Sequence, residues 1–315
     1  MLDVDASVVV PAYNRKAAVA ACLGTLACQD YPALRWEAIV VDDGSSDGTR
    51  EAAESWRGTM SLTVIASGSR CGSGPARNLG VRSARGSVLI FIDSDVLAPP
   101  WFVSAHVRNH EQGGCFVDAP AISVRGAASS RRPRFDTPWV RALAALDRWG
   151  ASFVTANASC LKADFLAAGG FDEAFGVRYG WEDSELGVRF LERGLRRRRD
   201  RRAYVLHWQG RWHDWRERGR KQEESGFNAA YFVAKHPEPT IRRWVERRLR
   251  VGRLLGACGI DVSRSAAMCA RRDRGEGPPE WAVQVHEAVR YAAGFALASQ
   301  LRGSMRPQDG ACTSQ

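Results

Sequence analysis

Several patterns that would assign this chain to a common functional class are missing from its sequence. No apolar run approaches the roughly 18 residues that a bilayer-spanning helix needs, so we expect no transmembrane helix. The segment Met1 to Asp5 is acidic and has no basic stretch before an apolar core, which argues against a secretory signal peptide. The eight cysteines are scattered without a Cys-x-x-Cys pair, so we expect reduced thiols in a cytoplasmic protein rather than a zinc site.

The sequence also lacks a Gly-x-Gly-x-x-Gly loop after its first predicted strand, which disfavours a dinucleotide-dependent dehydrogenase. What it does have is an ordinary globular composition, because 45% of the 315 residues are hydrophobic and 25% are charged. Lysine and arginine number 45 against 35 acids, which gives a net charge of +10. This basic balance suits a phosphate-bearing ligand, an anionic membrane surface or a nucleic acid.

Strands and helices are predicted to alternate over residues 6–119. Short apolar stretches rich in valine and isoleucine predict strands, and the segments between them have helical spacing or helix-starting residues such as Asp47 and Pro75. The alternation is typical of an α/β fold with a mostly parallel, doubly wound sheet. The predicted strands are 7–10, 37–41, 62–65 and 87–92, and the predicted helices are 16–27, 47–56 and 75–84.

Polar residues follow three of these strands, at the edge where ligands bind on sheets of this type. Two carboxylates, Asp93 and Asp95, come directly after the apolar run Val88–Ile92. Such a pair is costly at the end of a buried strand unless a cation compensates it, and Mg²⁺ is often held by carboxylates together with substrate phosphates. An Asp-x-Asp in an ordinary surface turn is the alternative. The polar segments that share this edge are Pro11-Ala12-Tyr13-Asn14, Asp42-Asp43 and Asp93-Ser94-Asp95.

Five segments of the chain follow one another in a characteristic order: Val8–Asn14, Val40–Ser45, Gly74–Gly80, Asp93–Asp95 and Trp181–Asp183. Taken together they resemble the family 2 glycosyltransferases of the GT-A fold, in which such segments occur in the same order. The resemblance covers roughly residues 6–210, and the rest of the chain carries no family signal. It implies a Rossmann-like, mostly parallel sheet flanked by helices, and an inverting transfer of a sugar from a nucleoside-diphosphate donor.

The resemblance places the donor site in the first half of the chain. Pro11–Asn14 would form the turn where Tyr13 meets the nucleobase, although an ordinary strand-ending turn fits the same residues. One acid of the pair Asp42 and Asp43 would bind the base or the ribose, and we favour Asp43; the alternative is turn chemistry before the glycine that comes next. Arg77, in the first turn of a helix, would bind phosphate through its guanidinium group unless it is merely solvated.

The resemblance also implies a divalent cation, Mn²⁺ or Mg²⁺, as cofactor. Asp95 would be its main ligand, and Asp93 would bind the ribose or a second position on the metal side, with Ser94 in the binding stretch between them. His207, placed after a predicted strand, would complete the metal shell as a neutral imidazole, although a lone histidine is more often structural. The cation would neutralise the nucleoside diphosphate as it leaves.

Asp183 is the predicted catalytic base, because in the family the Asp of a Glu-Asp pair preceded by an aromatic residue takes the acceptor proton. It would begin a helix that runs to about Arg193, and a helix N-terminus favours the ionised carboxylate. A dry site or the neighbouring Glu182 must therefore raise its pKa. Two acids in a first helical turn also occur without any catalytic role. Trp181 would wall the sugar or acceptor site, or would pack in the core.

The domain division is predicted from the same segments and from the more helical pattern after Pro237. The predicted parts are a catalytic domain (1–236), made of a nucleotide-sugar half (1–119) and an acceptor-side half (120–236), then a helical extension (237–305) and a disordered tail (306–315). The acceptor-side half would contain a short strand at 152–155 and a lid near 211–221. The arginine run 196–202 is expected to be a solvated or phosphate-attracting face rather than a specific nucleic-acid site.

The expected function is transfer of a sugar from a nucleoside-diphosphate donor, preferably UDP-linked, to an acceptor hydroxyl. Two alternatives stay open: a sugar-1-phosphate nucleotidyltransferase, which would want a Gly-rich basic loop after the first strand, and a non-catalytic nucleotide- or RNA-binding protein. The acceptor is either a small natural product or a glycan, which includes lipid-linked forms. Peripheral membrane contact through the basic helix 242–255 stays open, as does the oligomeric state, with a homodimer among the options.

Overall fold

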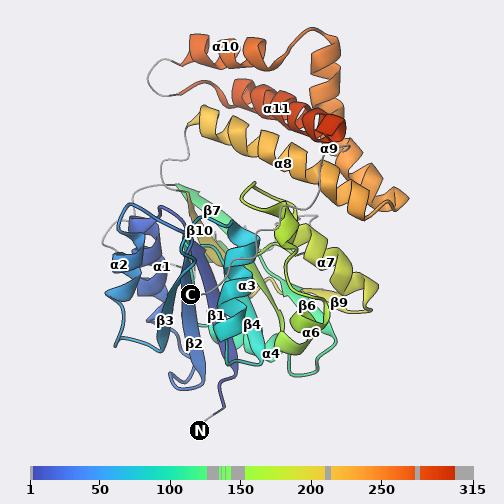
Figure 1. Ribbon diagram of the computed structural model, residues 1–315. Coiled ribbons are helices and arrows are strands. Elements are labelled where there is room, and N and C mark those ends of the chain that lie inside the picture. Colours follow the sequence, from blue (N-terminus) through green and yellow to red (C-terminus); the bar gives the residue numbers. More distant parts are fainter. Residues whose placement is uncertain are drawn as a thin grey trace. The chain divides into compact units, whose positions relative to one another are not determined.

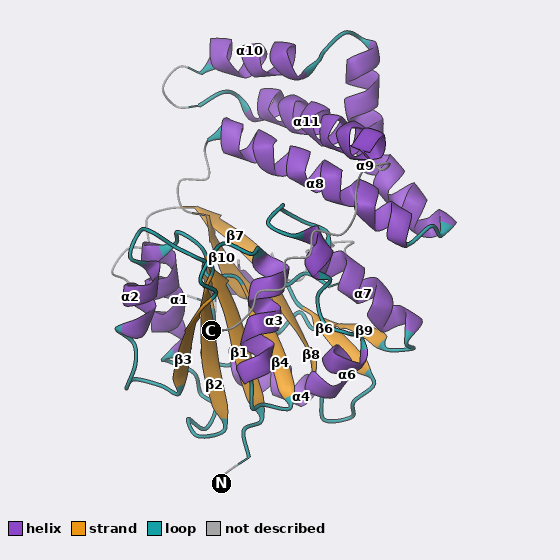
Figure 2. Ribbon diagram, viewed as in Figure 1, coloured by secondary structure: helices purple, strands orange, loops and turns teal. Residues whose placement is uncertain are grey.

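The computed structural model describes residues 3–125, 135, 137, 138, 140–142, 153–209, 214–273 and 277–301. These residues fall into two compact units (Figure 1). The α/β unit takes in Met1–Gly176 and Glu182–Gly210, and the helical unit takes in residues 177–181 and the helices α8 to α11. Among the described residues, every strand lies in the α/β unit (Figure 2). The predicted tail 306–315 lies outside the described residues.

A mostly parallel sheet of seven strands forms the centre of the α/β unit. β8 runs antiparallel to its neighbours β4 and β6, and the other neighbouring strands pair in parallel. The predicted α/β fold with a mostly parallel sheet is therefore confirmed. In spatial order the strands are β3 (Leu62–Ala66), β2 (Trp36–Asp42), β1 (Ala6–Ala12), β4 (Val88–Ile92), β8 (Asn157–Leu161), β6 (Cys115–Asp118) and β9 (Arg196–Arg199).

Helices cover both faces of this sheet, which explains why its central strands are continuous apolar runs. On β1, Val8 and Val10 pack in the core beneath one set of helices, and Val9, which points the other way, packs beneath the second set. The first set is α1 (Lys16–Leu26), α2 (Thr49–Glu54) and α4 (Phe102–Asn109), and the second is α3 (Ser73–Ser83), α6 (Lys162–Ala167) and α7 (Glu182–Glu192).

A second, three-stranded sheet continues from the end of β4. Its strands are β5 (Val96–Leu97), β10 (Val205–Gln209) and β7 (Ala121–Arg125), in the order β5-β10-β7. β5 begins directly after Asp95, and it pairs antiparallel with β10 so that Val96 lies opposite His207. This pairing brings two segments that are more than 100 residues apart in sequence to the same place.

The helical unit contains α8 (Trp215–Lys235), α9 (Pro239–Ala257), α10 (Val262–Arg272) and α11 (Glu280–Leu301). α8 and α11 cross at two glycines that leave room for close backbone approach: a Cβ at Gly226 would collide with the carbonyl of Tyr291, and one at Gly294 would collide with the carbonyl of Glu223. No helix among the described residues combines the length and the apolar character that crossing a membrane requires.

The structure differs from the predicted domain parts at two points. α8 belongs to the helical unit, because Arg218 on α8 forms ion pairs with Glu280 and Glu287 at 2.7 Å each and because α8 packs along α11, so the boundary lies near residue 210 and not at 236. The described part of the predicted lid, 214–221, is the start of α8. The described residues of the predicted strand 152–155 are not in a strand, and β8 begins two residues later, at Asn157.

Candidate active site

The carboxyl ends of β1, β2 and β4 meet at one edge of the large sheet, because these three strands are parallel neighbours. The turn after β1, the acids at the end of β2 and the Asp-x-Asp after β4 therefore share that edge, as the sequence predicts. Asn157, at the start of the antiparallel β8, lies opposite Ile92 at the same edge.

Asp93, Asp95 and His207 gather at this edge, each with one potential ligand atom within 4.8 Å of the others. His207 Nε2 lies 3.1 Å from Asp95 Oδ1, and Asp95 is 9% exposed. Burial alone would raise the pKa of Asp95, but the hydrogen bond and charge of His207, with the charge of Arg15, bring it below its usual value. Two carboxylates and one imidazole are a donor set that suits Mn²⁺ or Mg²⁺. The prediction that His207 comes after a strand is wrong, because it lies within β10.

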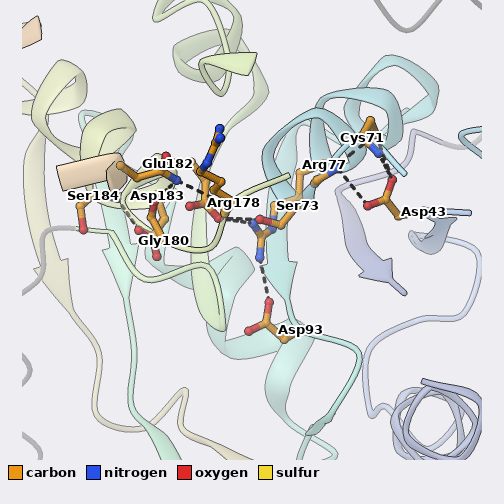
Figure 3. A network of polar contacts seen from close by, with 12 residues as sticks. Asp43, Cys71, Ser73, Arg77, Asp93, Arg178, Gly180, Glu182, Asp183 and Ser184 are labelled. Atoms are coloured by element: carbon orange, nitrogen blue, oxygen red, sulfur yellow. Dashed lines mark hydrogen bonds and ion pairs between the residues drawn. The ribbon is translucent and has the colours of Figure 1, made fainter. Parts of the chain in front are cut away.

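Arg77 links two acids that lie far apart in the sequence (Figure 3). Its Nη2 donates to Asp93 Oδ1 at 2.8 Å and its Nη1 to Glu182 Oε1 at 3.4 Å. The side chain is 3% exposed, so the alternative of a merely solvated arginine is wrong. Ser73, the first residue of α3, also donates to Glu182 Oε1, at 2.6 Å. The start of α3 is thereby connected to both the Asp-x-Asp and the Glu-Asp pair.

Asp183 and Glu182 begin α7, as predicted. Removal from water, and the neighbouring Glu182 carboxylate, raise the pKa of Asp183 to about 7 against the opposing charge of Arg77. The N–H of Ser184 donates to Asp183 Oδ1 at 2.6 Å and holds the carboxylate in place. Of the two causes weighed from sequence, removal from water is the larger and the Glu182 carboxylate adds to it. A carboxylate with a pKa near neutrality is suited to accept a proton.

The two acids at the end of β2 have different surroundings. Asp43 is 4% exposed, and its oxygens accept the backbone N–H of Cys71 at 2.7 Å and of Gly72 at 3.0 Å. It therefore fixes the loop that leads into α3. Asp42 accepts the N–H of Ser45 at 3.4 Å through Oδ2, and its buried Oδ1 has no hydrogen-bond partner among the described residues. Asp42 thus keeps a free oxygen at the sheet edge, whereas Asp43, which we favoured, holds a loop.

Only two of the four residues predicted for the turn after β1 lie in that turn. Pro11 and Ala12 are the last residues of β1, where Pro11 pairs with Val41, so their assignment to the turn is wrong. Asn14 has a positive φ of 50°, and it joins the turn to the loop after β2 because Ser46 N–H donates to its Oδ1 at 2.9 Å. Tyr13 is 37% exposed and has the guanidinium of Arg70 4.4 Å above its ring. A partly exposed aromatic ring at this edge is suited to stacking on a planar ligand. Ser94 is buried in the turn between β4 and β5.

Trp181 takes the second of its two predicted roles. It is 4% exposed, and its ring stacks on Phe232 at 5.1 Å between ring centres and meets Trp244 edge-on at 5.0 Å. These partners lie on α8 and α9, so Trp181 is part of the core of the helical unit. The structure therefore gives no support to the alternative that Trp181 lines the sugar or acceptor site.

Similarity to known proteins agrees with this geometry. The model of the family described as "Glycosyl transferase family 2" matches residues 7–168, slightly more than half of the chain. The chain belongs to glycosyl transferase family 2. A second model, described as "N-terminal domain of galactosyltransferase", matches residues 141–208, which include the Glu-Asp pair and His207. The assignment made from the five sequence segments is confirmed.

Two curated relatives show how much of the chain this family membership covers. Validoxylamine A glucosyltransferase of Streptomyces hygroscopicus subsp. jinggangensis is 33% identical over 229 residues, which cover 60% of this chain and 52% of that protein. The uncharacterized glycosyltransferase YfnE of Bacillus subtilis is 30% identical over 248 residues, which cover 62% of this chain and 63% of that protein. The match thus spans about half of the first relative and under two thirds of the second.

Solved structures show that this family 2 member has the GT-A fold. The mannosyltransferase PcManGT from Pyrobaculum calidifontis, in complex with GDP-Man and Mn²⁺, has a TM-score of 0.65 at 19% identity, over 93% of this chain and 86% of that one. TarS 1–349 of S. aureus, in complex with UDP-GlcNAc, has a TM-score of 0.53 at 17% identity, over 94% of this chain and 92% of that one. Both likenesses extend over the helical unit, which carried no family signal in sequence.

Three residues that position the site were not identified from sequence. Ser73 binds Glu182. Asn78 on α3 braces the segment before α7, because its side chain donates to the carbonyl of Phe171 and accepts from the N–H of Phe171, both at 2.9 Å. Asn157 donates to the carbonyls of Pro120 at 2.9 Å and Ala203 at 2.7 Å, just before β7 and β10, and so fixes the sheet that carries His207. Asn78 lies in Gly74–Gly80, one of the five segments that resemble the family, and this was the one indication in the sequence that it belongs to the site.

Proposed function

We propose that this chain transfers a sugar, with inversion at the anomeric carbon, from a UDP-linked donor to an acceptor hydroxyl, and that Asp183 is the general base. One observation supports the proposal above all: a single buried arginine, Arg77, contacts both the Asp-x-Asp and the Glu182 next to Asp183. A sugar whose diphosphate lies at the Asp-x-Asp would therefore be within reach of a base at the start of α7. This arrangement supports a displacement in which the leaving group and the base share one site.

We assign the cation site to Asp93, Asp95 and His207. A divalent cation bound there would supply positive charge to the diphosphate as it leaves. The chain's own contribution is to keep Asp95 ionised, since His207 and Arg15 hold its pKa low, and to orient Asp93 through Arg77. The positive end of α3 and its Arg77 add to the potential that favours an anion at this edge.

We assign proton removal to Asp183. Its raised pKa lets the carboxylate accept a proton from the acceptor hydroxyl near neutral pH, and the N–H of Ser184 orients it. The hydroxyl oxygen then attacks the anomeric carbon from the face opposite the diphosphate, the bond from that carbon to the phosphate oxygen breaks, and the electron pair leaves with the nucleoside diphosphate. Glu182, held by Ser73 and Arg77, keeps the pKa of its neighbour high.

We propose that the donor is a uridine nucleotide and that its uracil base binds between the turn after β1 and the end of β2. Tyr13 offers an exposed ring face, and Asp42 offers a free buried oxygen to a base or ribose donor group. The two structural neighbours are a complex with UDP-GlcNAc and a complex with GDP-Man, so the same fold carries both kinds of donor.

For the acceptor we propose a small natural product, because one relative is named for glucosylation of validoxylamine A. A lipid-linked glycan is the rival. α9 presents the exposed residues Arg243, Arg247 and Arg250 with Val251 (54% exposed) and Leu254 (68% exposed), a combination that suits peripheral contact with anionic lipid. Sedimentation with phosphatidylglycerol vesicles tests that contact: binding that is lost at high salt and absent with phosphatidylcholine supports the lipid-linked acceptor.

The decisive experiment is a thermal-shift panel of nucleotide sugars with and without Mn²⁺, followed by transfer assays with the donor that stabilises the protein most. Cation-dependent stabilisation by a UDP-sugar is expected, because a ligand that binds only the folded state raises its melting temperature. Release of pyrophosphate from UTP and a sugar phosphate would instead identify a nucleotidyltransferase. Salt-sensitive RNA binding without turnover of any nucleotide sugar would identify a binding protein.

A further inference from the structure

Residues 177–181 belong to the helical unit, although the chain on both sides of them belongs to the α/β unit. They follow the short helix η1 (Glu173–Phe175) and lead without a break into Glu182 and Asp183. The peptide bond from Trp181 to Glu182 thus joins the helical unit to the residue just before the proposed base.

The backbone of this segment is held along α8. Asn228 on α8 is 3% exposed, and its amide group donates to the carbonyl of Arg178 at 3.2 Å and to the carbonyl of Gly180 at 3.0 Å. Glu224, one turn earlier on α8, accepts the N–H of Tyr179 at 3.2 Å. One helix therefore fixes three successive residues of the segment through two side chains.

The last two residues of the segment have backbone conformations that need outside support. Gly180 has φ 92° and approaches α8 so closely that a Cβ there would lie 3.1 Å from Ser225 Oγ. Trp181 has φ 79°, a left-handed conformation that bulky residues rarely adopt. Its ring is held between Phe232 and Trp244, with the guanidinium of Arg248 5.4 Å from the ring centre. Such outliers persist where the surroundings over-determine them, and they are frequent at functional sites.

We propose that the helical unit positions the base: α8, through Asn228, holds residues 178–181 in the conformation that sets the direction in which Asp183 leaves the start of α7. Asn228 is then a positioning residue that acts through the segment and touches no substrate. The inference rests on the proposed function, since it requires Asp183 to be the base. Displacement of a catalytic group by about 1 Å lowers turnover by roughly 100-fold, so slack in this segment is expected to lower kcat.

The test variant is Asn228→Leu, which keeps the side-chain size and removes both donors. We expect kcat at saturating donor and acceptor to fall by at least about 10-fold, with donor KM and Mn²⁺ affinity within about twofold of the unchanged protein. The split is expected because the residues assigned to donor and cation lie on β1, β2, β4, β10 and α3 or in the turns that follow these strands. The segment leads instead into the Glu182–Asp183 pair, and Glu182 has its own partners on α3. A purely structural loss would instead lower the folded fraction and leave the kcat of the folded protein and its KM unchanged.

Ser265→Ala is the matched control. Ser265 is also fully buried in the helical unit, but it lies on α10. Its hydroxyl donates to the carbonyl of Val262 at 2.9 Å and bonds His286 Nδ1 at 3.0 Å, and neither partner belongs to residues 177–181. Its kcat should stay within about twofold of the unchanged protein. Glu224→Ala, which removes one partly exposed acceptor, should show a smaller loss, about threefold in kcat.

The outcomes separate this inference from the proposed function. If kcat of Asn228→Leu and Glu224→Ala matches that of Ser265→Ala, the inference is overturned while the base assignment stands. If Asn228→Leu does not fold by circular dichroism, Glu224→Ala decides alone: a lowered kcat at unchanged donor KM supports positioning by α8, and an unchanged kcat refutes it. Normal turnover of Asp183→Asn would remove the proposed function first, and the inference with it.

Discussion

The two units of this protein use charged residues in different ways. The α/β unit contains deeply buried pairs, in which Arg77, at 3% exposure, binds Asp93 and Glu182, beside exposed ones such as Arg50 with Glu54. In the helical unit the described pairs range from Arg218 with Glu287, at 24% and 20% exposure, to Arg253 with Glu246, at 52% and 41%. Buried charges are retained against a desolvation penalty, so they call for a functional reason, whereas exposed pairs contribute little. We therefore expect the α/β unit to supply the catalytic groups and the helical unit to position them.

The largest expected effect is that of Asp183→Asn in the α/β unit. The amide cannot accept the acceptor proton, so kcat should fall by about 10³-fold while donor binding persists. Isothermal titration with UDP and Mn²⁺, together with single-turnover transfer, measures both quantities. Glu192→Gln, at the exposed end of the same helix, is the control and should leave kcat unchanged. Near-normal turnover of Asp183→Asn would show that the general base does not lie on α7. The proposed difference in role between the two units would then have no support.

The next effect in size is that of Asp95→Ala. Loss of this carboxylate removes the partner of His207 and the main proposed cation ligand, so Mn²⁺-dependent donor affinity should fall by at least about 100-fold. Titration of UDP at fixed Mn²⁺, and the reverse, gives the two affinities. Glu51→Ala on the exposed surface of α2 controls for the change in net charge. Unchanged cation dependence would place the cation elsewhere.

A smaller effect is expected on the pH profile. Asp183 must be deprotonated to act, and its pKa is about 7, so kcat should fall as the pH drops below neutrality. Glu182→Gln removes the negative charge that helps to raise this pKa, and the acidic limb of the kcat profile should then move to lower pH. Glu192→Gln, at the exposed end of α7, is the neutralisation control and should leave the limb in place. A limb that moves to higher pH, or stays fixed in Glu182→Gln, would contradict the coupling.

The smallest effect should come from Arg218→Ala on α8. Arg218 binds Glu280 and Glu287 on α11, with side chains that are partly solvated, so its removal should lower the free energy of unfolding by no more than about 1 kcal/mol. Urea unfolding measures this change, and kcat should not respond. Because Asn228 lies on the same helix, a kcat effect at Asn228 without one at Arg218 would show that α8 has a positioning side and a merely stabilising side. Equal effects of the Arg218 and Asn228 variants on kcat would show that α8 has no separate positioning side.

Local sequence patterns predicted the parts of the fold that depend on neighbouring residues. The apolar run Val88–Ile92 became β4, and its two trailing carboxylates came to the sheet edge as expected, because a parallel strand's end is fixed by the strand itself. The pKa rise at Asp183 was local only in part, since burial, its larger cause, depends on the fold, whereas the second cause, Glu182, is its sequence neighbour.

The parts that depend on distant partners were not predictable. His207 stands inside β10 because that strand pairs with β7 along its whole length and with the two-residue β5 at Leu206 and His207. β5 has no strand pattern of its own. α8 was assigned to the wrong unit because its partner, α11, lies about 60 residues further along the chain. Trp181 gave no sign in sequence of whether it faces ligand or core, because the rings that cover it come from α8 and α9.

The arginine run was predicted as a solvated or phosphate-attracting face, and its first four residues form an edge strand. β9 pairs in parallel with β6, and its residues alternate between exposed and partly buried positions. Arg197 and Arg199 share one side of the strand, and both reach Asp118 Oδ2, at 2.5 Å and 2.8 Å. A single buried acid thus turns a highly charged segment into part of the sheet, which no local propensity indicates.

As a result, β9 should tolerate a shift of its pairing register by one residue. In most edge strands a slip of one residue turns every inward side chain outward and destroys the pairing pattern. Here four consecutive positions, Arg196–Arg199, carry the same side chain, so a slip by one leaves another guanidinium facing Asp118. Insertion or deletion of one residue in the preceding loop, around Gly194, should therefore leave the sheet intact. Changes in chain length should be tolerated at this edge of the sheet.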